Sequence, residues 1–156
     1  MRCVSITVGA KAIDAVVAFE QVEPLRTSSF PGLPARAISL MPGLRGHRCD
    51  NGEGLTFVEE LADTEIAHLL EHVTVELMAL SGSPDTLAGR TVWDFAADGR
   101  GVFHVRIEYD DDLVAIGALS EASAIVDRLC ALDARPDAPD PDIHAVVAGL
   151  RVVRRR

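Results

Sequence analysis

The segment between residues 57 and 80 most constrains how this chain can fold. Its apolar residues recur at spacings of three and four, which gives an α-helix one broad face for burial. These residues are Ile66, Leu69, Leu70, Val73, Leu77 and Leu80. Thr56 and Glu59 have the pattern of a capping box, and Gly82 suits the position just beyond a helix end. The sequence therefore predicts one continuous helix over 57–80.

A strand over 102–109 is the second clear prediction. Its side chains alternate between apolar and polar, as expected of a strand with one buried face. We expect Phe103, Val105, Ile107 and Tyr109 to face the core.

The remaining elements are assigned from apolar runs and from the positions of proline and glycine. They are strands at 3–8 and 14–23, a short helix or strand at 35–41, and helices at 113–132 and 143–153. This order predicts an α+β fold, a two-layer sandwich in which a small mixed or antiparallel sheet packs against helices. We expect residues 1–132 to form this domain. Residues 133–156 would supply a Pro/Asp linker and a C-terminal helix that packs on the domain or trails from it.

The composition limits the classes of function. The 156 residues carry a net charge of −9, whereas a nucleic-acid-binding domain needs a basic face. The basic run 154–156 is interpreted as a solvated tail. Cys3, Cys49 and Cys130 are odd in number and lack CxxC spacing, so we expect no disulfide. No segment has the pattern of a membrane span or a signal peptide, and we therefore expect a cytoplasmic protein.

A possible metal site lies within the predicted helix. His68 and His72 are four residues apart, so both imidazoles project from one helix face and could share a zinc ion. Glu71 could act as the general base that takes a proton from a zinc-activated water. The order His-x-x-Glu-His is the inverted zincin pattern. The competing interpretation is a solvated helix face that carries two histidines and no metal.

Glu76 continues the same series, but it lies about 12 Å along the helix axis from His68. We therefore interpret it as a partner that fixes the tautomer of His72, or as a substrate contact. Arg90, which follows Gly89, could bind a substrate carboxylate or be an ordinary loop arginine.

The third protein ligand must come from outside the helix. His47 and Cys49, in the glycine-rich loop before it, are the leading candidates, with His47 placed first. Glu108 and His104, on the polar face of the predicted strand, follow. If they are not ligands, Cys49 and Glu108 could instead contact a ligand or the substrate. The acidic run 110–112 could bind a cation, although an exposed turn is the simpler interpretation.

Several segments resemble the N-terminal domain of cyanophycin synthetase, in the same order and at comparable spacing. Residues 40–49 resemble its LLPGL-x-x-H-x-C stretch, and residues 68–77 resemble its H-x-x-EH-x-x-x-EL helix. Further matches are 89–91 to its GRT turn, 102–109 to its VY-x-VV-x-EY strand, and 142–153 to the helix that leads toward the ATP-grasp domain. Together they span roughly residues 33–153.

The resemblance implies a function linked to cyanophycin, a poly-aspartate chain with arginines attached through isopeptide bonds. In that family the N-terminal domain supports polymer binding and oligomer packing, and some members carry a metal-dependent hydrolytic site. The chain is too short for the ATP-grasp and Mur-ligase-like domains of the synthetase. The residues that match the family's motifs are His68, Glu71, His72 and Glu76, together with His47 and Cys49.

Two hypotheses follow from the motif and the resemblance. The first is a stand-alone, zinc-dependent hydrolase of amide or isopeptide bonds in a cyanophycin-like, acidic and Arg-bearing peptide. The second is a non-catalytic peptide-binding or assembly module that partners a separately encoded ATP-dependent ligase. Either could form a homo-oligomer. The chain departs from the family at 50–52, where Asp-Asn-Gly replaces Ser-Glu-Gly, and at 54–57, where Gly-Leu-Thr-Phe replaces Gly-Gly-Phe.

Overall fold

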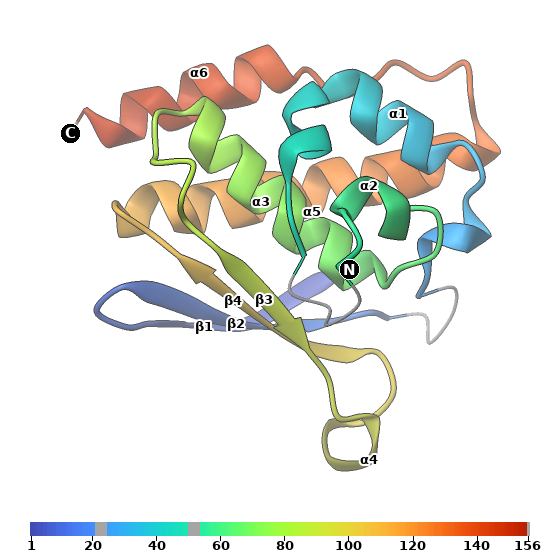
Figure 1. Ribbon diagram of the computed structural model, residues 1–156, viewed down its shortest axis with the longest axis horizontal. Coiled ribbons are helices and arrows are strands. Elements are labelled where there is room, and N and C mark those ends of the chain that lie inside the picture. Colours follow the sequence, from blue (N-terminus) through green and yellow to red (C-terminus); the bar gives the residue numbers. More distant parts are fainter. Residues whose placement is uncertain (21–24, 50–53, 156) are drawn as a thin grey trace.

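An antiparallel sheet forms one layer of the molecule, and helices form the other (Figure 1). The computed structural model describes residues 1–20, 25–49 and 54–155, within which the chain forms four strands and six α-helices. The strands are β1 (Arg2–Val8), β2 (Ala12–Ala18), β3 (Gly89–Val92) and β4 (Val102–Glu108), in the order β1-β2-β4-β3. The predicted α+β sandwich is confirmed, with an antiparallel sheet.

The helices are α1 (Leu33–Leu40), α2 (Phe57–Glu60), α3 (Ile66–Leu80), α4 (Phe95–Asp98), α5 (Asp112–Ala134) and α6 (Ile143–Arg154), with 3₁₀ turns η1 (Thr27–Ser29) and η2 (Pro42–Gly46). All the α-helices except α4 gather on one face of this sheet, whereas α4 lies in the connection between β3 and β4, away from the helix layer (Figure 1). The two long helices α3 and α5 lie side by side on the sheet, with α3 against β3 and β4 and α5 against β1 and β2. The C-terminal helix α6 packs on α5 and α3, and its Ile143, Val147 and Leu150 join the main core.

The core lies between the inner face of the sheet and the helix pair. Strand alternation places Ile13, Ala15 and Val17 of β2 opposite Ile107, Val105 and Phe103 of β4, and all six side chains are buried. Leu69, Leu70, Val73 and Leu77 of α3 pack above them. The alternation predicted for 102–109 is therefore confirmed at its three central inward positions.

The prediction of one helix over 57–80 is wrong, because the chain leaves the helical path between α2 and α3. The capping box is present, since the Thr56 N–H donates to the Glu59 carboxylate at 2.7 Å. Residues 61–65 instead pair with the segment around Thr27. The Thr27 N–H donates to the Thr64 carbonyl at 2.8 Å, and the Thr64 N–H donates to Thr27 Oγ1 at 2.9 Å. A distant segment thus satisfies the backbone groups that a continuous helix would have used.

The end of α3 follows the expected chemistry. Gly82 has φ +101°, a conformation that suits glycine. The Ser83 N–H donates to the Met78 carbonyl and the Gly82 N–H to the Ala79 carbonyl, both at 3.0 Å, which is the Schellman arrangement. Leu80, which was expected on the buried face, is 37% exposed.

Two other local predictions change. Residues 89–91, which resembled a turn, belong to the edge strand β3. The strand expected over 14–23 ends at Ala18, and its last positions lie outside the described residues. The uncertain segment 35–41 is helical and lies mostly in α1.

The connection from β3 to β4 carries a group of aromatic side chains. Trp93 lies 6.3 Å from Phe95 and 5.7 Å from Phe103, measured between ring centroids. Phe103 is buried, whereas Trp93 is 45% exposed.

Cys3, Cys49 and Cys130 are free thiols, as predicted. Within the described parts of the chain, no helix has both the length and the apolarity needed to cross a membrane.

Candidate metal centre

Three side chains that can bind a metal converge above the first half of α3. The Nε2 atoms of His68 and His72 lie 3.1 Å apart, as their i,i+4 spacing predicts for one helix face. Cys49 follows η2, and its Sγ lies 3.3 Å from His72 Nε2 and 3.7 Å from His68 Nε2. All three donor atoms lie within 4.8 Å of one another. They therefore form a compact set from one helix and one loop.

His47 lies on the opposite edge of the His72 ring. Its Nδ1 is 2.9 Å from His72 Nδ1, and its Nε2 is 3.1 Å from Glu76 Oε2. The structure thus brings Cys49 to the two Nε2 atoms and places His47 behind them, the reverse of the order predicted. Glu76 reaches His72 through His47, whereas a direct partnership was expected.

The hydrogen bonds around these histidines suit a metal held by the Nε2 atoms. If His72 Nε2 is unprotonated, the ring proton resides on Nδ1 and is donated to His47 Nδ1. His47 then carries its own proton on Nε2 and donates it to the Glu76 carboxylate. His68 Nδ1 lies 2.9 Å from Thr64 Oγ1, so that proton also has an acceptor. Such partners fix the tautomer and the ring orientation of histidines that bind a metal.

The neutral imidazoles that metal binding requires are favoured here. Burial, with smaller contributions from the neighbouring His68 and His47, lowers the pKa of His72 to about 2. Burial also lowers the pKa of His68, against the opposing effect of the Glu60 carboxylate. A sulfur and two imidazole nitrogens form a donor set typical of zinc.

Cys49 has the opposite requirement, because a thiol must lose its proton to bind a metal. Without a metal, burial and, to a smaller extent, the Glu60 and Glu71 carboxylates raise the pKa of Cys49 to about 12. A bound cation reverses this balance by stabilising the thiolate. Metal uptake at this centre should therefore release a proton.

Glu71 lies beside the cluster on the same helix and is buried. The Thr91 hydroxyl of β3 donates to its Oε2 at 2.6 Å. Burial, partly offset by the Thr91 hydrogen bond, raises the pKa of Glu71 to about 7. Because Thr91 occupies one carboxylate oxygen, Oε1 remains to meet a proton.

Two glycines make room for the carboxylates of α3. A Cβ on Gly89 would overlap Cγ of Glu71, and a Cβ on Gly43 would overlap the carboxylate of Glu76. Both glycines lie in segments that resembled the family's motifs. Their role could not be read from the sequence, because it depends on which side chains the fold brings against them.

Phe57 is a further contributor that the sequence did not reveal. Its ring stacks on that of His72, with centroids 3.8 Å apart and planes 19° apart, and it meets His68 edge-on at 5.7 Å. The break between α2 and α3 sets this position. Phe57, Thr64 and Thr91 together limit how the two ligating rings and Glu71 can move.

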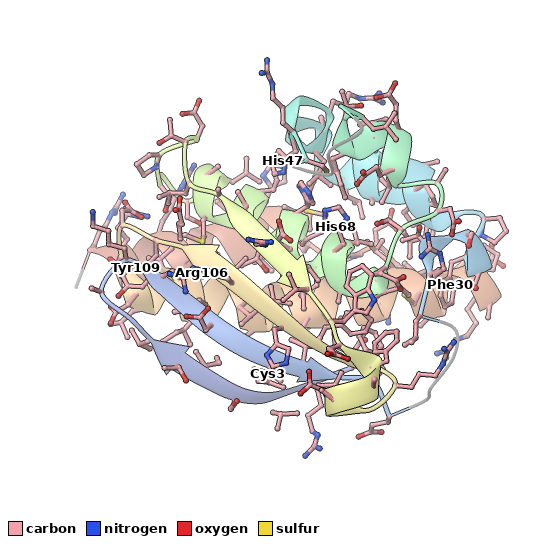
Figure 2. The ribbon with its side chains drawn as sticks, turned by 60° about the horizontal axis from the view of Figure 1, so that its bottom comes forward. Cys3, Phe30, His47, His68, Arg106 and Tyr109 are labelled. Carbon is pink, nitrogen blue, oxygen red and sulfur yellow. The ribbon has the colours of Figure 1, made fainter. Side chains whose placement is uncertain are left out.

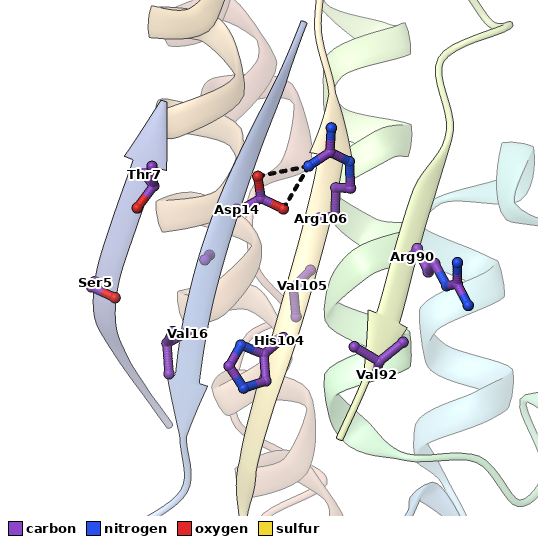
Figure 3. A pocket seen from close by; sticks show the side chains of 10 residues that line it. Ser5, Thr7, Asp14, Val16, Arg90, Val92, His104, Val105 and Arg106 are labelled. Carbon is purple, nitrogen blue, oxygen red and sulfur yellow. Dashed lines mark hydrogen bonds and ion pairs between the residues drawn. The ribbon is translucent and has the colours of Figure 1, made fainter. Parts of the chain in front are cut away.

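Three residues considered for the site lie on the outer face of the sheet, away from α3. Arg90 and His104 line the concave surface seen in Figure 3. His104 Nε2 contacts Asp98 Oδ2 at 3.0 Å, and Glu108 accepts from the Ala88 N–H at 3.1 Å. His104 and Glu108 are therefore not part of the metal centre. Strand alternation explains the result, because the residues between the core positions of β4 must point outward.

The acidic run 110–112 also has structural partners. Asp110 forms an ion pair with Arg154 at 2.6 Å, and Asp111 caps α5 by accepting from the Leu113 and Val114 N–H groups. The motif departure at 50–52 lies outside the described residues.

Fold and site together describe a small α+β domain with a Cys-His-His cluster that could hold a metal ion. A comparison with models of protein families matches residues 14–131 to the cyanophycin synthase-like N-terminal domain. The match covers more than half of the chain, and the protein therefore belongs to this family. No curated protein matches the chain in a sequence search.

Proposed function

We propose that this domain is a zinc-dependent hydrolase of amide or isopeptide bonds in a cyanophycin-like peptide. The observation that carries the proposal is the convergence of Cys49 Sγ with His68 and His72 Nε2, beside the buried Glu71 carboxylate. Family membership supports a relationship to a peptide or polymer of this kind. Figure 2 shows His47 and His68 in the region between α3 and the segment that carries η2 and α2.

Zinc would be held by Cys49, His68 and His72. When bound, it supplies a Lewis acid that polarises the scissile carbonyl and lowers the pKa of water. Glu71 Oε1 takes a proton as the water oxygen attacks the carbonyl carbon. The same atom returns the proton to the leaving nitrogen as the carbon–nitrogen bond breaks. Thr91 holds Oε2 throughout, which keeps the carboxylate in one rotamer.

His47 and Glu76 influence the ligand His72 through the ring nitrogen that does not face the metal. The Glu76 carboxylate attracts the Nε2 proton of His47, and His47 Nδ1 then accepts the Nδ1 proton of His72. This chain makes His72 Nε2 a stronger electron donor. It also explains how a glutamate too far from His68 to be a ligand still belongs to the site.

The test compares three variants on a synthetic oligomer of β-Asp-Arg units, each loaded with zinc and assayed for metal content. Glu71→Gln should keep zinc and lose about 10²–10⁴-fold in hydrolysis, because an amide cannot accept the proton. Cys49→Ser and His72→Ala should lose both metal and activity. His104→Ala is the matched control, since this histidine lies on the outer face of the sheet.

A Glu71→Gln protein as active as wild type would remove Glu71 as the base. A wild type that holds zinc yet cleaves no acidic, Arg-bearing or isopeptide substrate would favour a peptide-binding or assembly module instead.

A further inference from the structure

Within the described parts of the chain, the edge strand β3 has backbone groups that pair with no other strand, and they lie beside the candidate metal centre. It is the last strand of the order β1-β2-β4-β3, so β4 covers only one of its sides. The Glu108 N–H donates to the Ala88 carbonyl at 2.9 Å, which places these two residues in a hydrogen-bonded pair. Hydrogen-bonded and non-bonded pairs alternate along an antiparallel ladder.

The register assigns the pairs that follow. Arg90 opposite Arg106, and Val92 opposite His104, are hydrogen-bonded pairs, whereas Gly89 and Thr91 fall in the non-bonded pairs. The backbone N–H and C=O groups of Gly89 and Thr91 therefore point away from β4, toward the open edge.

Gly89 and Thr91 are also the residues of β3 that meet Glu71. Thr91 donates to its carboxylate, and Gly89 leaves the space that its side chain fills. Figure 2 shows His47 and His68 on the side of β3 that faces away from β4. A chain laid along this edge would thus pass directly beside the proposed base.

The outer face of the same edge carries the guanidinium group of Arg90 (Figure 3). Arg106 forms two hydrogen bonds with Asp14, at 2.7 and 2.8 Å, and its charge is balanced. Among the residues that the structure describes, no carboxylate forms an ion pair with Arg90. Figure 3 shows its side chain extending past β3 on the side away from β4. Arg90 and Val92 both line a hollow on the outer face of the sheet, with a volume of about 520 Å³.

We propose that an extended peptide binds as a fifth strand on the open edge of β3, with an acidic side chain against Arg90. Its main chain would pair with the N–H and C=O groups of Gly89 and Thr91, which is the mode of strand addition to an exposed sheet edge. Because side chains alternate along a strand, those on one face would meet Arg90 while those on the other turn toward Glu71 and the metal centre. The cleavage of the bound peptide rests on the proposed function, whereas its binding rests only on the geometry of the sheet edge.

Amide hydrogen exchange, followed by NMR in zinc-loaded Glu71→Gln protein, tests the binding mode without cleavage. In the free protein the Gly89 and Thr91 amides should exchange faster than those of Arg90 and Val92. A blocked six-residue peptide of alternating Asp and Ala should then slow exchange at Gly89 and Thr91 by about tenfold or more. The same peptide with Lys in place of Asp is the control and should protect them far less.

Absence of protection at both amides with millimolar peptide would overturn the proposal. So would protection that already exists without peptide and rises with protein concentration, since β3 would then pair with a second copy of the chain. The metal-free protein should show the same protection, so the edge is tested independently of hydrolysis. Hydrolysis that persists without protection would overturn the edge proposal alone.

Arg90→Gln tests the side-chain contact. It should weaken binding of the Asp peptide by roughly tenfold, because a charge-assisted hydrogen bond is lost. Arg106→Gln is the matched control on the same face, and its charge is already balanced by Asp14. Equal effects of the two variants would remove Arg90 from the contact.

Discussion

Individual residues of the centre depend on one another more closely than their spacing in the chain suggests. Glu71 and Glu76 are buried carboxylates on one helix, and each occupies space left by a glycine from another segment. The position of the Glu71 side chain therefore requires a glycine at 89, and that of the Glu76 side chain requires a glycine at 43. Either carboxylate would have to move if its glycine gained a side chain.

Gly89→Ala should lower the free energy of unfolding by about 1–3 kcal/mol, the usual cost of an overpacked site. The cause is overlap of the new Cβ with Glu71. Urea unfolding measures the change. Gly46→Ala is the control, because nothing lies within 4 Å of a Cβ at that position. In a Glu71→Ala background most of the Gly89→Ala penalty should vanish, and a penalty that persists there would contradict this explanation.

Glu76→Gln should weaken zinc binding by roughly 10–100-fold, the usual effect of losing a partner behind a ligating histidine. The amide removes the negative charge that attracts the His47 proton. Competition with a chromophoric chelator gives the affinity. Glu121→Gln, an exposed change on α5, should leave it unaltered. Equal affinities of wild type and Glu76→Gln would show that the chain through His47 does not tune the metal.

At the level of elements, the periodicity of the sequence predicted features that depend on neighbouring residues, and it missed features that depend on contacts between distant segments. The His68–His72 pair lies on one helix face because four-residue spacing alone determines that geometry. The break between α2 and α3 depends on pairing with the segment around Thr27, far upstream in the chain. The place of Cys49 beside both Nε2 atoms depends on the path of the loop after η2. No local sequence pattern predicts the helix break or the position of the Cys49 sulfur, although the sequence did identify His47 and Cys49 as candidate ligands.

The contact that fastens α6 to the end of α3 is sensitive to pH. Arg154 forms an ion pair with Asp110, and Ser83 donates to the same carboxylate at 2.8 Å. The hydrogen bond from Arg154 holds the pKa of Asp110 below its ordinary value of 3.8. A lowered pKa stabilises the folded state above the unfolded pKa, and this contribution is lost as the pH falls through the folded one.

Asp110→Asn should therefore destabilise the protein at pH 7, by about 0.5–1 kcal/mol for a partly exposed pair. As the pH falls below 3.8 and through the lowered pKa of Asp110, the difference from wild type should shrink, because the carboxylate becomes protonated. Urea unfolding at pH 7 and over a series of lower pH values measures both. Asp127→Asn is less suitable as a control, since that carboxylate binds the N-terminal ammonium; Asp85→Asn, on an exposed turn, is preferable. A difference that stays constant with pH would contradict the linkage.

For the whole molecule, a metal at this centre would join the loop that follows η2 to the helix α3. A ligand that binds only the folded state stabilises it by about 2.7 kcal/mol at 100 times its Kd. For a chain of this size, 1 kcal/mol corresponds to roughly 2–4 °C in Tm. Zinc should therefore raise Tm by about 5–10 °C.

Calorimetry with and without a chelator checks this expectation. The His68→Ala/His72→Ala double variant should show no response to either zinc or chelator. A wild-type Tm that changes with neither zinc nor chelator would argue against a metal at this centre.

The position of the lone tryptophan has a practical consequence for all such measurements. Trp93 follows β3 directly and is 45% exposed, so we expect its emission in the native protein to be close to that of a solvated indole. Fluorescence will change little when the core melts, whereas far-ultraviolet circular dichroism follows the helices. The two curves need not coincide even for a cooperative transition, and their divergence would not by itself indicate an intermediate. The same indole is a local reporter for the end of β3, where a shift in emission would register an event that leaves the helices untouched.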